Sequence, residues 1–173
     1  MQHLMIRVVL VAVLGLVAAL PVMAQDTGDV TARLLSKSVM AGFQTGLDSA
    51  EADGGVDPGL ARCLRTLDPL SMEPSFRRLL ASRFSDAELA RLDAFYGSPL
   101  AELHLRSIIS ALRVTNGLPD NDPVTLTDTQ RVEAEVFFAS DLGKRVDAIG
   151  GEADAEGAQV IDAEIDQFVE RCS

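Results

Sequence analysis

The stretch Phe84 to Glu102, FSDAELARLDAFYGSPLAE, is the most informative part of the chain, because it aligns without a gap with Leu126 to Lys144, LTDTQRVEAEVFFASDLGK. Both stretches present the same order of features: a helix cap, a helix, a pair of aromatic residues, a serine and a leucine. The identical positions are Asp86 and Asp128, Phe95 and Phe137, Ser98 and Ser140, and Leu100 and Leu142. This order predicts a duplicated helical unit, with copies at about 84–117 and 126–150, but it names no reaction.

Each copy carries a strong signal for a helix start. Ser85 is followed three residues later by Glu88, and Thr127 is followed at the same spacing by Gln130. In such a capping box the two side chains satisfy backbone N–H groups that the first helical turn leaves free. Both copies are therefore predicted to begin a helix at this point.

The two copies differ after their aromatic pairs. In the first copy, Ser98 and Pro99 provide a cap and a first turn for a new helix, so a helix, a kink and a second helix are predicted. The second copy keeps Ser140 but has no proline. Its helix is predicted to bend less, or to run straight through to Ile149.

The remainder of the chain also reads as helical. Apolar residues at helical spacing, together with turn signals, predict further helices at about 30–50, 57–67, 73–83 and 154–171. No alternation of apolar and polar residues that is typical of a strand occurs outside the N-terminal stretch. The predicted fold is all-α, a compact orthogonal or up-down bundle of about six to seven helices.

The N-terminus has the layout of a cleavable secretory signal peptide. Arg7 precedes the apolar run Val8 to Leu20, and the small residues Val22 and Ala24 suit cleavage after Ala24. The alternative is a retained membrane anchor, but a spanning helix needs roughly 20 apolar residues, which the run reaches only by counting through Pro21. The interpretation is a periplasmic protein with no stable membrane anchor and a single helical domain at 25–173.

The chain is acidic. Its formal net charge is −11, and loss of Arg7 with residues 1–24 makes the charge of the remaining 149 residues −12. Such a surface repels nucleic acid and anionic lipid headgroups. Acidity therefore indicates either plain solubility or a basic partner such as another protein.

Two cysteines in an exported chain predict one disulfide, between Cys63 and Cys172. Both lie in apolar stripes at helical spacing: Leu60, Leu64 and Leu67 around Cys63, and Ile161, Ile165 and Phe168 ahead of Cys172. Such a link would add on the order of 4 kcal/mol in the loop-entropy account. The alternatives are two free buried thiols or a metal site, and the absence of a CxxC spacing argues against zinc.

No motif for catalysis, metal or cofactor binding is present. His104, the one histidine outside the signal peptide, lies between two leucines of a predicted helix, which is typical of a structural or surface residue. A calcium loop starting at Asp120 would place Val124 and Arg131 at ligand positions, so that hypothesis fails. No catalytic, cofactor-binding or metal residue is predicted.

The paired aromatic residues allow two interpretations. They pack in the core where the two copies meet, or they line a shallow apolar groove that receives a peptide or a lipid. Adjacent residues on a helix face different directions, so one member of each pair is available for a groove. The candidate groove residues are Phe95, Tyr96, Ser98, Pro99, Phe137 and Phe138.

The pairs Glu88-Leu89, Phe95-Tyr96 and Ser98-Pro99 resemble an exported bacterial family called domain of unknown function 2059. Its members have F-Y-x-S-P-x-G after a capped helix; here Ala101 stands in place of the glycine, and the second copy has Gly143 but no tyrosine or proline. The resemblance implies a helical periplasmic domain and supplies no catalytic residues.

Three functional hypotheses follow. The leading one is a non-enzymatic periplasmic protein that binds another protein or a small apolar ligand. The second is an inhibitor or immunity protein against a toxin or lysozyme-like enzyme, since acidity suits a cationic target. The third is a glycan-cleaving enzyme using an acid pair, either Glu88 with Asp93 or Glu133 with Glu135.

Overall fold

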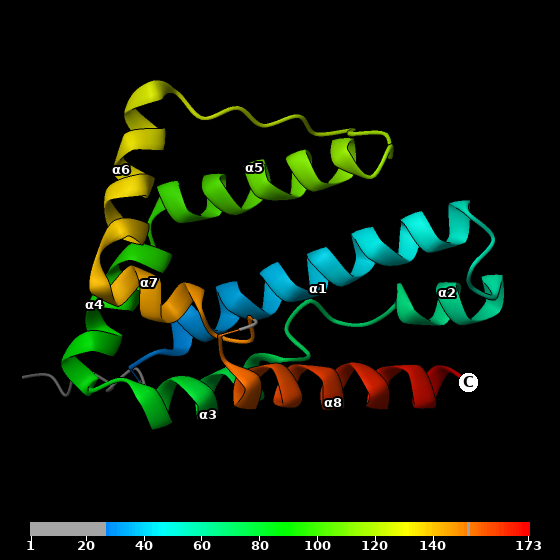
Figure 1. The fold of residues 1–173 in the computed structure, drawn as a ribbon, viewed down its shortest axis with the longest axis horizontal. Helices are drawn as coiled ribbons and strands as arrows, with labels where there is room; N and C mark the ends of the chain where they lie inside the picture. The colour runs from blue at the N-terminus through cyan, green and yellow to red at the C-terminus, as the bar shows by residue number, and fades with distance from the viewer. Residues whose placement is uncertain (1–26, 152) are drawn as a thin grey trace, which may run out of the picture.

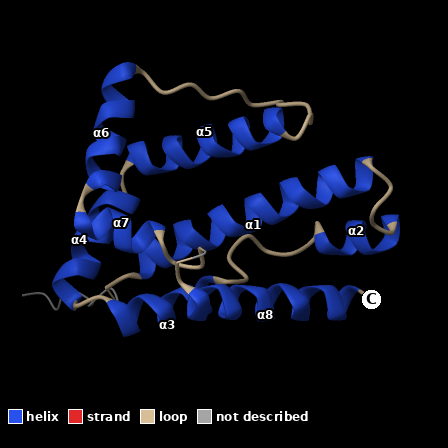
Figure 2. Cartoon of the chain, in the orientation of Figure 1, coloured by secondary structure: helices blue, strands red, loops and turns tan. Residues whose placement is uncertain are grey.

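The computed structural model describes residues 27–151 and 153–173. These residues form eight α-helices. Helices and loops, with no strand, make up this part of the chain in Figure 2. The helices are α1 (Asp29–Ala52), α2 (Pro58–Leu64), α3 (Glu73–Arg83), α4 (Asp86–Tyr96), α5 (Pro99–Thr115), α6 (Asp128–Ala139), α7 (Asp141–Asp147) and α8 (Ala155–Cys172). The all-α prediction is confirmed, with one helix more than the upper limit of six to seven.

The predicted signal peptide, residues 1–24, lies outside the described residues. Within residues 27–151 and 153–173, none of the helices combines the length and apolar character needed to span a membrane.

Helix α1 is the centre of the arrangement (Figure 1). It packs against α5 on one side and against α2 and α3 on the other, and α8 covers α2 and α3. Helices α4, α6 and α7 lie across one end of α1 and α5, whereas the C-terminus lies at the opposite end (Figure 1). The two copies of the repeated segment thus meet at the end of the molecule where α1 begins.

One hydrophobic core connects these helices. Its fully buried large side chains include Met40 of α1, Leu64 of α2, Phe76 of α3, Leu92 of α4 and Phe168 of α8. Burying an apolar side chain of this size contributes about 1.5–3 kcal/mol relative to leaving it exposed. Leu64 and Phe168, one from each of the apolar stripes predicted around the cysteines, are both part of this core.

The first turn of α1 is capped by a residue from α4. The N-cap position, Gly28, has φ 96° and makes no side-chain cap of its own. Instead, the carboxylate of Asp93 accepts hydrogen bonds from the N–H of Gly28 at 2.7 Å, the N–H of Thr31 at 2.9 Å and the hydroxyl of Thr31 at 2.7 Å. These bonds satisfy donors that a helix start leaves free, and they hold α4 against α1.

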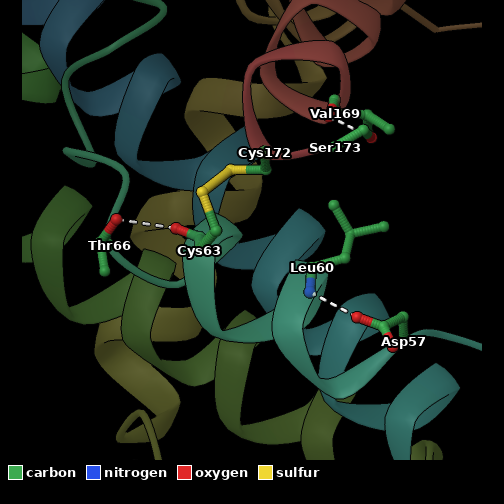
Figure 3. Close-up of a disulfide and its surroundings, with 7 residues drawn as sticks. All are labelled: Asp57, Leu60, Cys63, Thr66, Val169, Cys172 and Ser173. Carbon is green, nitrogen blue, oxygen red and sulfur yellow. Dashed lines mark hydrogen bonds between the residues drawn. A yellow bond between two sulfur atoms is a disulfide. The ribbon is translucent and has the colours of Figure 1, made fainter.

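The predicted disulfide is present at the other end of the molecule. Cys63 of α2 bonds to Cys172, the last residue of α8, with the two Cα atoms 5.6 Å apart (Figure 3). Both helix ends are held locally: the hydroxyl of Thr66 donates to the carbonyl of Cys63 at 2.7 Å, and the N–H of Ser173 donates to the carbonyl of Val169 at 3.0 Å (Figure 3). The disulfide thus joins α2 to the C-terminal end of α8.

Both repeated segments turn a corner at their serine. Ser98 caps α5 by accepting a hydrogen bond from the N–H of Ala101 at 3.3 Å, and Ser140 caps α7 by accepting from the N–H of Gly143 at 3.0 Å. The alternative in which the second helix runs straight through to Ile149 is wrong. Ser140 has an extended backbone, with φ −68° and ψ 157°, so a capping serine breaks the helix without a proline. Duplication itself stays a prediction.

Candidate functional site: a pocket walled by aromatic rings

A pocket of about 100 Å³ opens where α1, α4, α5, α6 and α7 meet. Its aromatic walls come from both repeated segments: Phe95 and Tyr96 from α4 and Phe138 from α6. Leu34 of α1 and Leu105 of α5 supply aliphatic walls. The site exists because the corners at the two serines bring the ends of α4 and α6 together.

The four aromatic residues form one cluster. Phe95 stacks on Phe137, with ring centroids 3.5 Å apart and an interplanar angle of 4°. The ring of Phe95 is nearly perpendicular to the rings of Tyr96 and Phe138, with an interplanar angle of 87° in each pair. The ring centroids are 5.3 Å apart for Tyr96 and 5.6 Å apart for Phe138. Edge-to-face pairs of this kind stabilise aromatic clusters. The cluster packs the two segments together, and three of its rings also line the pocket.

The other predicted groove residues lie elsewhere. Phe137 packs against the core and is not among the residues that line the pocket. Ser98 and Pro99 line a second hollow of about 350 Å³, which shares Leu34 and Tyr96 with the first. Five of the six predicted groove residues therefore border two neighbouring hollows, whereas Phe137 borders neither, and the six do not line one continuous groove.

His104 is a polar group on the pocket wall. Its Nδ1 atom is buried and has no hydrogen-bond partner among the described residues, and its ring centroid lies 5.1 Å from that of Phe138. Burial lowers the pKa of His104 below its ordinary value of 6.5, against the opposing effect of the Asp147 carboxylate. The imidazole is therefore neutral at neutral pH.

Tyr96 and Asp147 complete the polar part of the pocket. Burial, followed by the charge of Asp147, raises the pKa of the Tyr96 hydroxyl, so this hydroxyl stays protonated. Asp147 of α7 is exposed while lining the pocket, which places its carboxylate at the rim. The pocket wall is therefore mostly apolar, with polar atoms from Ser38, Tyr96 and His104 and the Asp147 carboxylate at the rim.

The sequence interpretation did not place His104 or Asp147 in a site. For His104 a signal exists, because Ala101, His104, Leu105 and Ile108 fall on one helical face and all four line the pocket. For Asp147 the local sequence offers none. The residue reaches the pocket only because α7 turns at Ser140.

The acid pairs considered for glycan cleavage have other contacts. Glu88 accepts hydrogen bonds from the N–H of Ser85 at 2.8 Å and from the Arg145 guanidinium. These bonds, of which the one from the Ser85 N–H has the largest effect, lower the pKa of Glu88 to about 2. Such a pKa suits an ionised helix cap and not a general acid. Asp93 caps α1, whereas Glu133 and Glu135 are exposed on α6.

The part of the chain that the structure describes has no group of three or more histidine, cysteine, aspartate or glutamate residues arranged to hold a metal ion.

No family model matches the chain, and no curated protein and no solved structure matches it. The resemblance to domain of unknown function 2059 stays a prediction.

Proposed function

We propose that this chain is a non-enzymatic periplasmic binding protein whose aromatic pocket receives a small, largely apolar group. The observation that carries the proposal is the pocket itself, with walls from Phe95, Tyr96 and Phe138 and few polar groups. Small-molecule sites in proteins are typically concave, mostly apolar and equipped with a few placed polar groups.

The size of the pocket limits its occupant. A cavity of about 150 Å³ lined by apolar side chains holds a benzene molecule. At about 100 Å³, this pocket suits a group of a few heavy atoms, either a small molecule or the end of a larger one. A ligand that extends further would reach the neighbouring hollow beyond Leu34 and Tyr96.

Two features support a periplasmic location. The signal-like segment before Ala24 predicts export, and the disulfide between Cys63 and Cys172 is of the kind that persists in oxidising compartments. Both agree with a protein that works outside the cytoplasm.

The pocket contains its own optical probe. Tyr96 is the only tyrosine and the chain has no tryptophan, so tyrosine fluorescence reports from the pocket wall. Titration with small apolar molecules is expected to change this fluorescence saturably. Ser38→Leu should abolish the change, because Ser38 lines the pocket and a larger side chain fills it.

The matched control is Ser49→Leu, a half-buried serine on the same helix that lines none of the hollows described above. This variant should keep the full fluorescence response. A wild-type protein that responds to no ligand, or a Ser38→Leu variant that binds as well as the wild type, would contradict the proposal.

A second candidate function is the inhibition of a cationic enzyme, and the outer face of α6 favours it. Val132 and Val136 lie one helical turn apart and are 57 % and 68 % exposed. The acidic residues Glu133 and Glu135 flank them. An apolar stripe between negative charges is complementary to a basic protein surface.

This second candidate is tested with a cationic peptidoglycan hydrolase. The wild-type protein should inhibit it, and the double variant Val132→Ser with Val136→Ser should lose inhibition while Tyr96 keeps its ligand response. Inhibition that is unchanged in the double variant would exclude the α6 face as the contact.

A further inference from the structure

The charged groups on the wall of the aromatic pocket have one sign. Among residues 27–151 and 153–173, no lysine or arginine lines this pocket, and burial holds His104 neutral. Asp147 is charged and exposed, and within the described residues it forms no ion pair. A bound cation would therefore meet an uncompensated carboxylate, whereas a bound carboxylate would meet a like charge.

The rings of the pocket walls are arranged at right angles. The plane of Phe95 makes an angle of 87° with Tyr96 and also with Phe138. Aromatic rings attract cations through their negative faces, and walls of several rings around one space are the arrangement that recognises alkylated ammonium groups. Such a group also has an apolar surface that suits Leu34, Leu105 and Ile108.

We propose that the pocket binds an alkylammonium group, whose methyl groups contact the aromatic and aliphatic walls and whose positive charge faces Asp147. This inference rests on the proposed function of the pocket as a ligand site, and it adds the chemical class of the ligand. The compact shape of a trimethylammonium group agrees with a pocket of about 100 Å³, which leaves no room for a long chain.

The discriminating experiment compares choline with its carbon isostere, in which a tert-butyl group replaces the trimethylammonium group. The two molecules have nearly the same shape and differ in charge. Binding is measured by Tyr96 fluorescence and by isothermal titration calorimetry on the full mature chain. Choline is expected to bind about tenfold more tightly than the isostere.

Two variants separate the charge from the rings. Asp147→Asn should weaken choline several-fold and leave the isostere unchanged, and the matched control Asp141→Asn, an exposed aspartate of the same helix that does not line the pocket, should change neither. Phe138→Leu keeps an apolar wall but removes a ring, so it should weaken choline more than the isostere.

The outcomes distinguish this inference from the proposed function. If the isostere or a short fatty carboxylate binds as tightly as choline, the alkylammonium assignment is overturned while the apolar ligand site stands. If none of these molecules binds, both fail. Equal losses in Asp147→Asn and Asp141→Asn would assign the effect to net charge and overturn the role of Asp147.

Discussion

At the scale of single residues, His104 shows how a site forms from an unremarkable position. It lies on the apolar face of α5, where the sequence predicted a structural or surface residue, and that face borders the pocket. Its buried Nδ1 lacks a hydrogen-bond partner in the described part of the chain. Its burial also makes the stability of the folded protein depend on pH, because a desolvated imidazole resists protonation.

The first prediction concerns this pH dependence. Because burial lowers the pKa of His104 in the folded protein, the unfolded chain binds the proton more strongly. The contribution of neutral His104 to stability is fully present above pH 6.5, the ordinary pKa of histidine. It is lost as the pH falls through the lower pKa that His104 has in the folded protein. Urea unfolding should therefore show that the free energy of unfolding decreases as the pH is lowered from about 7.5 to about 5.

The control for this prediction is His104→Gln, which removes the titrating group. The other ionisable groups facing it are Asp147 of α7 and Tyr96 of α4, and Tyr96 stays protonated throughout this range. The variant should show a smaller slope than the wild type. Identical slopes would mean that His104 does not contribute.

At the scale of helices, the capping boxes and serine corners explain how the two segments fold. The N–H of Ser85 donates to Glu88 at 2.8 Å, and the N–H of Thr127 donates to Gln130 at 3.0 Å, so both predicted helix starts are confirmed. The corners differ in length. In the first segment, Gly97 lies between the end of α4 and Ser98, the serine that caps α5. In the second segment, α6 runs directly into Ser140.

The second prediction follows from the tighter corner. A Cβ atom on Gly143 would overlap the carbonyl oxygen of Phe137, and that oxygen belongs to the backbone and cannot move aside. Gly143→Ala should therefore destabilise the protein by about 1–3 kcal/mol, measured by denaturant unfolding. The corresponding Ala101 of the first segment is accommodated at the longer corner, where it lines the pocket.

The matched control is Gly46→Ala in the middle of α1. A Cβ atom there meets nothing within 4 Å, so the alanine should stabilise the helix by about 0.5–1 kcal/mol. Destabilisation of both variants by the same amount would show that the α6–α7 corner has no special requirement for glycine.

At the scale of the whole molecule, the aromatic pocket and the disulfide lie at opposite ends. Helices α4, α6 and α7 gather where α1 begins, and the disulfide joins α2 to the C-terminal end of α8 (Figure 1). The long α1 connects these ends and packs against α5 along one side. Mutations at the disulfide are therefore expected to change stability without changing the pocket.

The third prediction uses this separation. Replacing Cys63 and Cys172 together by serine opens a loop with a sequence separation of 109 residues. In the loop-entropy account this should cost about 4–5 kcal/mol of unfolding free energy, measured in guanidinium chloride. Under conditions where the variant remains folded, the ligand response of Tyr96 should equal that of the wild type. An unchanged unfolding midpoint would contradict the stabilising role of the disulfide.

Much of the secondary structure was predictable because it depends on near neighbours in the chain. The bounds of α3 agree with the predicted 73–83, and the apolar stripes around Cys63 and Cys172 pointed both thiols inward. The break at Ser140 was missed, since proline was taken as the breaking signal and a serine cap alone was enough.

Most of the helices, their starts and the cysteine pairing follow from the sequence alone, because capping and helical periodicity act within a turn or two and two cysteines can pair in one way. Which residues contact one another depends on the tertiary structure. Asp93 caps a helix that begins more than sixty residues earlier, and five helices contribute to the pocket. No local pattern encodes these contacts, since they arise when packing of the core brings α4, α6 and α7 across the start of α1.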